Sequence, residues 1–307
     1  MKAAVVSSFD RPPAYADIAD PIPRGPDDLV VEVLAAGLHP RVRSQADGSH
    51  YTSTDELPLV PGIDGVGRDP EGRLRYFVLP DTTLGSMAER TVIDTRRSVL
   101  LPPGADPVAL AAAMNPAMSS WVALRRRIDF SAGQSVLVLG ATGNAGRLAV
   151  EVARLLGAGR IVAAGRSAER LAALGAVETI TFDELAGAAD VDVVLDYVWG
   201  EPTARALVDV VTARADRGKP LTWIEVGSVA GSTTAIPSAV LRAARLQLVG
   251  SGQGSVPTRD IVAELAALAE EVPRFDVDAR AVPLSAVTQA WVDAATSRQR
   301  IVITPRA

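Results

Sequence analysis

Residues 135–170 constrain the fold more than any other part of the chain. They comprise an apolar run (135–139), a glycine-containing segment (140–146), a segment with the apolar stripe of a helix (147–156) and a second apolar run (161–164). The two apolar runs do not alternate with polar residues, which is typical of parallel strands covered on both faces. The stretch therefore predicts a strand, a tight turn, a helix and a second parallel strand.

The turn between the first strand and the helix contains Gly140, Gly143 and Gly146 in the order GxxGxxG. Such glycines allow a sharp turn, a close approach of the backbone to a pyrophosphate, and close packing of helix on strand. The helix would then direct its free N–H groups at the phosphates. A strand-to-helix turn without a ligand would also fit, but the further strand–helix units favour a dinucleotide site. The candidate cofactor-binding residues here are Gly140, Thr142, Gly143, Asn144 and Ala145.

The end of the second strand distinguishes between coenzymes. A site for NAD places an acidic residue there to hold the ribose 2′-hydroxyl, whereas residues 159–168 contain no carboxylate. The guanidinium of Arg166 and the hydroxyl of Ser167, next to Gly165, suit a 2′-phosphate. Arg170 would supply a second cation, although a solvated helix residue explains it equally well. We predict NADPH rather than NADH.

The composition excludes several functional classes. A net charge of −5 and the lack of a basic run argue against a nucleic-acid surface, and no apolar run approaches the roughly 20 residues of a membrane span. The absence of cysteine excludes disulfides, thiolate zinc sites, iron–sulfur clusters and cysteine nucleophiles. The first residues are too soon charged for a signal peptide, so the cytoplasm is the expected location.

The chain before the dinucleotide segment is expected to be rich in strands. Strand candidates separated by Pro- and Gly-rich loops lie at 2–7, 29–36, 74–79 and 87–93. Residues 106–127 are expected to be helical, with Pro116 splitting the helix into two pieces.

The chain after Ser167 continues the alternation of strands and helices. Four more strands are expected, at 179–182, 191–197, 222–227 and 246–250. With the first two, they make a doubly wound, six-stranded parallel sheet, so the fold class is α/β. The C-terminal part is expected to hold a helix (258–270), a strand-loop-helix (281–295) and a final strand (300–304).

Five short motifs, in chain order, resemble those of one known family. They are GLHP (37–40), LPLVPGIDGVG (57–67), GSMAE (85–89), VVLD (193–196) and GSVAG (227–231). Together they are similar to motifs of the zinc-independent, quinone oxidoreductase-like branch of the medium-chain dehydrogenase/reductase superfamily.

The resemblance implies an organisation and an activity. It implies a GroES-like catalytic domain (1–117), a Rossmann domain that binds NADPH (118–254) and a return segment that completes the catalytic domain (255–307). The implied reaction transfers a hydride to a small-molecule quinone or an α,β-unsaturated carbonyl. It also implies a homodimer, because the strand near residues 246–249 would lie at the sheet edge and pair with its twin.

The chain departs from zinc-dependent relatives at two positions. Their cysteine ligand corresponds to His39 and their histidine ligand to Ile63. Isoleucine cannot coordinate a metal and the chain has no cysteine, so we expect no metal site. Asp64, beside Ile63, is expected to be structural and to hold its turn through backbone hydrogen bonds.

The remaining candidates follow from the resemblance. A loop implied to lie over the nicotinamide offers His39, Ser44 and Tyr51 as catalytic candidates, each with a structural alternative; Arg41 and His50 are weaker. The family pattern also implies further cofactor-binding residues, at the helix break and after the fifth and sixth strands: Asn115, Ser119, Gly227, Ser228 and Ser251.

Three other functions compete with this interpretation. An enoyl-thioester reductase of the same superfamily would need a groove for an acyl-carrier arm, which no motif marks. A short-chain reductase is excluded, because no tyrosine has a lysine four residues further on. A non-catalytic NADPH-binding sensor stays open, because the family has no indispensable acid whose loss would reveal inactivity.

Overall fold

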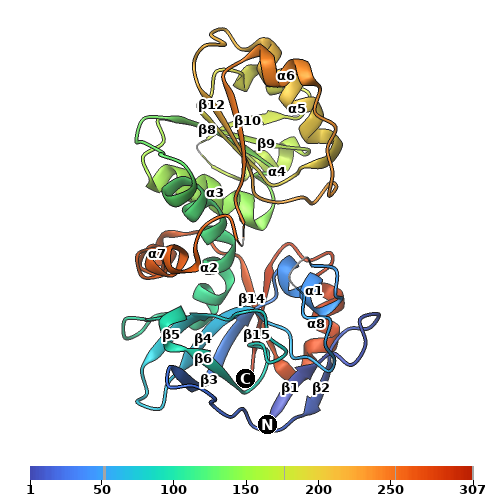
Figure 1. Ribbon diagram of the computed structural model, residues 1–307, viewed down its shortest axis with the longest axis vertical. Helices are drawn as coiled ribbons and strands as arrows, with labels where there is room; N and C mark the ends of the chain where they lie inside the picture. Colours follow the sequence, from blue (N-terminus) through green and yellow to red (C-terminus); the bar gives the residue numbers. More distant parts are fainter. Residues whose placement is uncertain (51–52, 176, 253, 306–307) are drawn as a thin grey trace. The chain divides into compact units, whose positions relative to one another are not determined.

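The computed structural model describes residues 1–50, 53–175, 177–252 and 254–305 (Figure 1). The chain forms two compact units. The first contains Met1–Asn115 and Ile261–Ala307, and the second contains Pro116–Asp260.

The second unit is built on a six-stranded sheet, in which every neighbouring pair of strands is parallel. The spatial order is β10-β9-β8-β11-β12-β13, which confirms the predicted doubly wound sheet. The strands are β8 (Ser135–Leu139), β9 (Arg160–Gly165), β10 (Glu178–Thr181), β11 (Val193–Asp196), β12 (Leu221–Glu225) and β13 (Leu246–Gly250).

Helices between these strands cover the sheet and make its core. The apolar stripe of α3 buries residues such as Leu148 and Val152, and the middle of β8 is wholly buried. That burial explains why the strands read as unbroken apolar runs. The helical elements are α3 (Asn144–Leu155), α4 (Ala168–Ala172), η3 (Leu185–Ala188), α5 (Gly200–Ala213) and α6 (Ser238–Ala243).

The first unit is β-rich, as predicted. A hairpin pairs β1 (Lys2–Val5) with β2 (Ala14–Asp17). A seven-stranded sheet has the order β14-β15-β3-β4-β5-β7, and β6 pairs with β3. Its strands are β3 (Asp28–Gly37), β4 (Asp64–Arg68), β5 (Leu74–Val78), β6 (Arg90–Asp94), β7 (Ser98–Leu100), β14 (Ala279–Pro283) and β15 (Arg300–Thr304).

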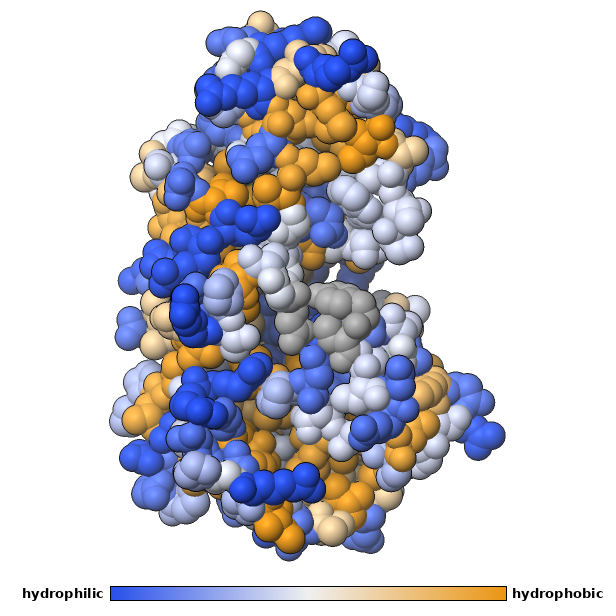
Figure 2. All heavy atoms as spheres, viewed as in Figure 1, coloured by the Kyte–Doolittle hydropathy of each residue, from blue (hydrophilic) through white to orange (hydrophobic). Residues whose placement is uncertain are grey.

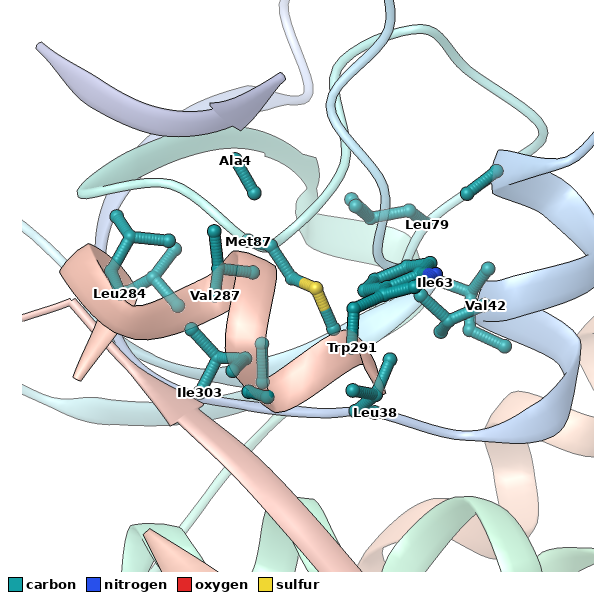
Figure 3. Packing of buried hydrophobic residues seen from close by; sticks show 14 of the residues in the cluster. Ala4, Leu38, Val42, Ile63, Leu79, Met87, Leu284, Val287, Trp291 and Ile303 are labelled. Carbon is teal, nitrogen blue, oxygen red and sulfur yellow. The ribbon is translucent and has the colours of Figure 1, made fainter. Parts of the chain in front are cut away.

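Short helices close the core of this unit. Figure 3 shows Trp291 beside Ile63 and Val42, with Met87 next to Val287. The burial of these side chains joins strands and helices that are far apart in the sequence. The helical elements are α1 (Pro40–Ala46), η1 (Thr95–Arg97), η5 (Leu284–Ala286) and α8 (Val287–Asp293).

The helix before the dinucleotide segment corrects one expectation. Pro116 does not split it: α2 runs without a break over Pro107–Val122 and continues as a π-helical segment, η2 (Ala123–Arg127). Proline removes one backbone hydrogen bond, but its neighbours Met114 and Ala117 are fully buried. Packing of these side chains keeps the helix continuous. Two further helical elements are α7 (Thr258–Glu271), which begins in the last residues of the second unit, and η4 (Val272–Arg274), which belongs to the first.

No helix in the described ranges is long and apolar enough to cross a membrane. On the face seen in Figure 2, hydrophobic side chains form separate areas between hydrophilic ones.

Candidate functional site

The glycine turn between β8 and α3 has the geometry that its sequence predicts. Gly140 has a φ of +84°, in the left-handed region that favours glycine. The N–H groups of Gly140 and Ala141 both donate to the carbonyl of Ala164 at 3.0 Å. A Cβ on Gly146 would lie 2.2 Å from the carbonyl oxygen of Gly140. The helix can therefore follow the strand this closely only with glycine at position 146.

The N-terminus of α3 suits an anion. The helix begins at Asn144, and its N-cap is Gly143, which has no side chain to cap the first turn. The N–H groups of Asn144 and Ala145 therefore lie at the positive end of the helix dipole without a capping side chain. They lie at the carboxyl edge of a parallel sheet, where nucleotide phosphates bind in such folds.

The end of β9 brings a cation to this turn. The guanidinium of Arg170 donates to the carbonyl of Thr142 at 2.8 Å, and a Cβ on Gly165 would lie 3.0 Å from the Thr142 methyl group. Ser167 caps α4, because its hydroxyl accepts the N–H of Arg170 at 3.3 Å. Arg166 is exposed. The structure thus brings Arg170 next to the glycine turn, and both Arg166 and Arg170 are exposed to solvent.

Asp196, at the end of β11, is a structural residue. Its carboxylate accepts hydrogen bonds from two backbone N–H groups, Val198 at 2.8 Å and Trp199 at 3.1 Å. It also accepts from the hydroxyl of Thr203 at 2.7 Å and from the indole of Trp223 at 3.0 Å. These four donors satisfy a carboxylate that is completely buried.

Glu225 is the last residue of β12, the strand next to β11. It was not among the candidate site residues named from the sequence. Burial, and next the charge of Asp196, raise the pKa of its carboxyl. Its register position opposite Asp196 could have been found only from the pairing of β11 with β12.

Ser119 of α2 contacts a tyrosine that sequence reasoning did not place in the site. The hydroxyl of Tyr197 lies 2.9 Å from Ser119 Oγ, and Ser119 donates to the carbonyl of Pro116 at 2.6 Å. Burial raises the pKa of Tyr197 to about 12, so its phenol keeps its proton at neutral pH. Asn115 lies in the same continuous helix rather than at a break.

The residues predicted after β12 and β13 lie at the carboxyl edge of the sheet. The N–H of Gly227 donates to the carbonyl of Asp196 at 3.1 Å, and the N–H of Ser251 donates to the carbonyl of Glu225 at 2.8 Å. The carbonyl of Ser228 accepts the N–H of Gly231 at 3.2 Å. The side chains of both serines are thus presented from turns anchored to the strand ends.

In the first unit, His39 is the N-cap residue of α1, but its side chain makes no capping bond. The side chain is only 2% exposed, and its Nε2 lies 3.3 Å from Oδ1 of Asp64. Within the described ranges, neither ring nitrogen has a hydrogen-bond partner, so the 3.3 Å approach is an electrostatic contact rather than an aligned hydrogen bond. Burial lowers the pKa of His39, while Asp64 opposes this shift.

Asp64 differs from the sequence expectation in its partners. It begins β4 rather than a turn, and its Oδ2 accepts the hydroxyl of Tyr76 at 2.6 Å instead of a backbone N–H. The backbone expectation was wrong because pairing of β4 with β5 places Tyr76 close to this carboxylate.

The position of Ile63 belongs to the apolar core. Ile63 packs in the cluster with Trp291 and Val42 (Figure 3) and offers no ligand atom. Among the residues that the structure describes, no group of three or more His, Cys, Asp or Glu side chains could hold a metal ion. The side chains present therefore do not fit the zinc site of zinc-dependent relatives.

The other candidates of this loop are engaged locally. The hydroxyl of Ser44 donates to the carbonyl of Arg41 at 3.0 Å, and Arg41 forms a 3.0 Å ion pair with Asp81. Burial, and next the charge of Arg41, lower the pKa of His50. Tyr51 lies outside the described residues.

These features define an α/β protein with a dinucleotide-type glycine turn. No family model matches the chain. The probable NADPH-dependent quinone reductase tdiC of Emericella nidulans is 33% identical to it, over 99% of this chain and 100% of that protein. A chloroplastic NADPH-dependent alkenal/one oxidoreductase of Arabidopsis thaliana is 29% identical, over 56% of this chain and 45% of that protein.

A solved structure agrees with these relatives. The quinone oxidoreductase of Thermus thermophilus, also solved in complex with NADPH, superposes with a TM-score of 0.78 at 26% identity, and the match covers 99% of this chain and 100% of that one. The chain belongs to the quinone oxidoreductase-like branch of the medium-chain dehydrogenase/reductase superfamily.

Proposed function

We propose that this protein is an NADPH-dependent oxidoreductase that works without zinc and reduces a quinone or an α,β-unsaturated carbonyl. The observation that carries the proposal is the cationic end of β9: Arg166 is exposed, and Arg170 donates to Thr142 of the glycine turn. With no carboxylate in residues 159–168, the pair favours a 2′-phosphate over a free ribose hydroxyl.

The residues of the second unit fit such a coenzyme. The uncapped N-terminus of α3, with Gly140, Gly143 and the N–H groups of Asn144 and Ala145, would hold the pyrophosphate. Ser167 and Gly165 would flank the phosphorylated ribose. The residues proposed to hold the nicotinamide half are Asn115, Ser119, Gly227, Ser228 and Ser251.

The chemistry on the acceptor side needs little from the protein. The coenzyme supplies a hydride from its nicotinamide ring, and the protein orients both reactants and excludes water. We propose that His39 contacts the bound acceptor, because a buried imidazole without a hydrogen-bond partner among the described residues is costly unless a ligand completes it. Ser44 and Tyr51 are proposed to line the same site, although Ser44 already donates to Arg41.

The test is consumption of NADPH, followed at 340 nm, with phenanthrenequinone and with a series of 2-alkenals. Treatment with a chelator before the assay should leave the rate unchanged, and NADH should be the poorer coenzyme. Turnover that disappears with the chelator and returns with zinc would refute a zinc-independent mechanism. Reduction of enoyl thioesters alone would identify the enoyl-thioester reductase, and tight NADPH binding without any turnover would identify a sensor.

The edge of the six-stranded sheet supports a second element of the proposal, a homodimer. β13 is an edge strand, and backbone groups on its outer side can pair with a second copy across a two-fold axis. Light scattering should then give twice the chain mass of 32.0 kDa. Leu248→Pro, at the centre of β13, should lower it to the single-chain value, whereas the same mass for both proteins would show that dimerisation, if present, uses another surface.

A further inference from the structure

Four buried polar side chains of the first unit act on one another through hydrogen bonds or charge. His39 and Asp64 are each 1% exposed, Tyr76 is 0% exposed and Arg300 is 8% exposed. They come from the start of α1, from β4, from β5 and from β15. Polar groups buried this deeply are almost always hydrogen-bonded, yet both ring nitrogens of His39 lack a partner among the described residues.

The charges in this cluster are balanced around Asp64. The hydroxyl of Tyr76 donates to its Oδ2 at 2.6 Å, and burial together with the Asp64 charge raises the pKa of Tyr76 well above its usual value, so the phenol keeps its proton. Arg300 supplies the opposite charge, with a pKa that burial lowers to about 10. It therefore remains a cation at neutral pH.

The backbone around His39 restricts the ring. Arg300 Nη1 donates to the carbonyl of Leu38 at 3.2 Å, and the N–H of Leu38 donates to the carbonyl of Ile301 at 2.9 Å. A Cβ on Gly37 would lie 2.4 Å from His39 Nε2. The Nε2 edge of the ring is thus packed between Gly37 and the carboxylate of Asp64, and the ring cannot turn that edge away without displacing the core.

We infer that Asp64, supported by Tyr76 and Arg300, positions His39 as a neutral imidazole that carries its proton on Nε2 and has its hydrogen-bond acceptor on Nδ1. A lone pair on Nε2 would face a carboxylate oxygen 3.3 Å away and be repelled, whereas an N–H there is attracted. A neutral ring with Nε2–H has its acceptor on Nδ1.

This assignment changes the role of His39 in the reaction. The role in ligand binding rests on the proposed function; the assignment of the tautomer does not. His39 would accept an O–H of an enol or hydroquinone, and it would not act as the acid that protonates the reduced acceptor. Asp64 is then a positioning residue, because it acts on the ligand through His39.

The charged groups that act on His39 have opposite effects. Burial lowers the pKa of His39 most, the Asp64 charge raises it, and the Arg300 charge lowers it further. On its own helix, Arg41 is paired with Asp81. Replacing Asp64 should therefore lower the pKa of His39, and replacing Arg300 should raise it.

Nuclear magnetic resonance tests the assignment directly. The chain has 2 histidines, so ¹⁵N-histidine labelling gives two imidazoles, and His50→Gln identifies the signals of His39. Without coenzyme or acceptor at pH 7, we expect the pattern of neutral Nε2–H. A neutral Nδ1–H ring, a fast tautomer mixture or an imidazolium at pH 7 would overturn the assignment. The result does not depend on NADPH binding or turnover.

The variants separate positioning from general structure. In Asp64→Asn the protonation midpoint of His39 should move to lower pH and the single tautomer should be lost. In Arg300→Gln the midpoint should move to higher pH. The surface control Arg90→Gln, from an exposed ion pair with Asp20, should leave it unchanged. Shifts of equal sign in the two core variants would contradict the network, and a variant that does not fold leaves the wild-type tautomer as the deciding result.

The pH dependence of turnover with phenanthrenequinone tests the acceptor role. If neutral His39 is required, the rate falls as the pH drops through its protonation midpoint. This fall should occur at lower pH in Asp64→Asn and at higher pH in Arg300→Gln. A profile that stays the same in both variants, while the resonance midpoints move, would show that His39 does not contact the reacting ligand.

Discussion

The guanidinium of Arg170 donates a 2.8 Å hydrogen bond to the main-chain carbonyl of Thr142. This contact joins the helix after β9 to the glycine turn after β8, two segments that a parallel sheet places at the same edge. Arg166, four residues earlier, is exposed, as is Arg170 itself. We therefore expect the two arginines to have different roles, which substitutions can separate.

Arg166→Ala should weaken NADPH binding far more than NADH binding. A charge-assisted hydrogen bond contributes about 1.5–3 kcal/mol, so the loss for NADPH is about 10- to 100-fold. Fluorescence titration of both coenzymes measures it. The matched control is Arg154→Ala, an exposed arginine at the far end of α3, which should change neither affinity. Equal losses for both coenzymes would show that Arg166 does not contact the 2′-phosphate.

Arg170→Ala should weaken both coenzymes, because it removes the hydrogen bond to Thr142 that holds the glycine turn. The loss should be larger for NADPH if Arg170 also contacts the 2′-phosphate. Arg170→Lys keeps the charge but not the planar geometry. Titrating this variant with both coenzymes distinguishes the contribution of the hydrogen bond to Thr142 from that of the charge. Unchanged NADH affinity in Arg170→Ala would mean that the hydrogen bond is irrelevant to binding.

Gly146→Ala should destabilise the second unit and abolish coenzyme binding. Its Cβ would lie 2.2 Å from the carbonyl oxygen of Gly140, so α3 must move away from β8. Gly143→Ala is the control: φ is −82° there and the nearest atom lies 3.4 Å from the added Cβ. It should retain the melting temperature of the wild type to within a few degrees. A Gly146→Ala protein of unchanged stability would argue against this close approach.

Asp196→Asn should lower the free energy of unfolding of the second unit by roughly 3–6 kcal/mol. An amide keeps one acceptor oxygen and turns an N–H₂ group toward two of the four donors, each lost bond to a charged group contributing about 1.5–3 kcal/mol. Urea unfolding followed by tryptophan fluorescence measures this loss; one of the four tryptophans, Trp223, donates to the carboxylate. Asp209→Asn, on the exposed face of α5, should change stability by less than about 0.5 kcal/mol.

Ile63→Ala should destabilise the first unit by about 2–5 kcal/mol, because it opens a cavity in the cluster around Trp291. Chemical unfolding followed by tryptophan fluorescence measures the loss. The control is Ile22→Ala, since Ile22 is 77% exposed and its substitution should have little effect. A loss for Ile63→Ala no larger than that for Ile22→Ala would show that position 63 does not support the core.

Local patterns in the sequence were sufficient for the parallel sheet and its glycine turn. Strands buried on both faces, such as β8, must be continuously apolar, and a turn as tight as the one at Gly140 requires glycine, so residue type and conformation are directly linked. The same logic placed Arg166 and Ser167 at the end of β9. The expectation that Pro116 splits the helix was wrong, because burial of neighbouring side chains outweighs the loss of one hydrogen bond.

The partners of the buried polar residues were decided only by the tertiary structure. Asp64 and Tyr76 are 12 positions apart, and Arg300 is more than 200 positions from both, so no local pattern links them. The same holds for Asp196 with Trp223 and for Ser119 with Tyr197. Periodicity reveals which face of a strand or helix is buried, but a hydrogen bond or charge contact depends on which elements pack together, and that is set by the whole core.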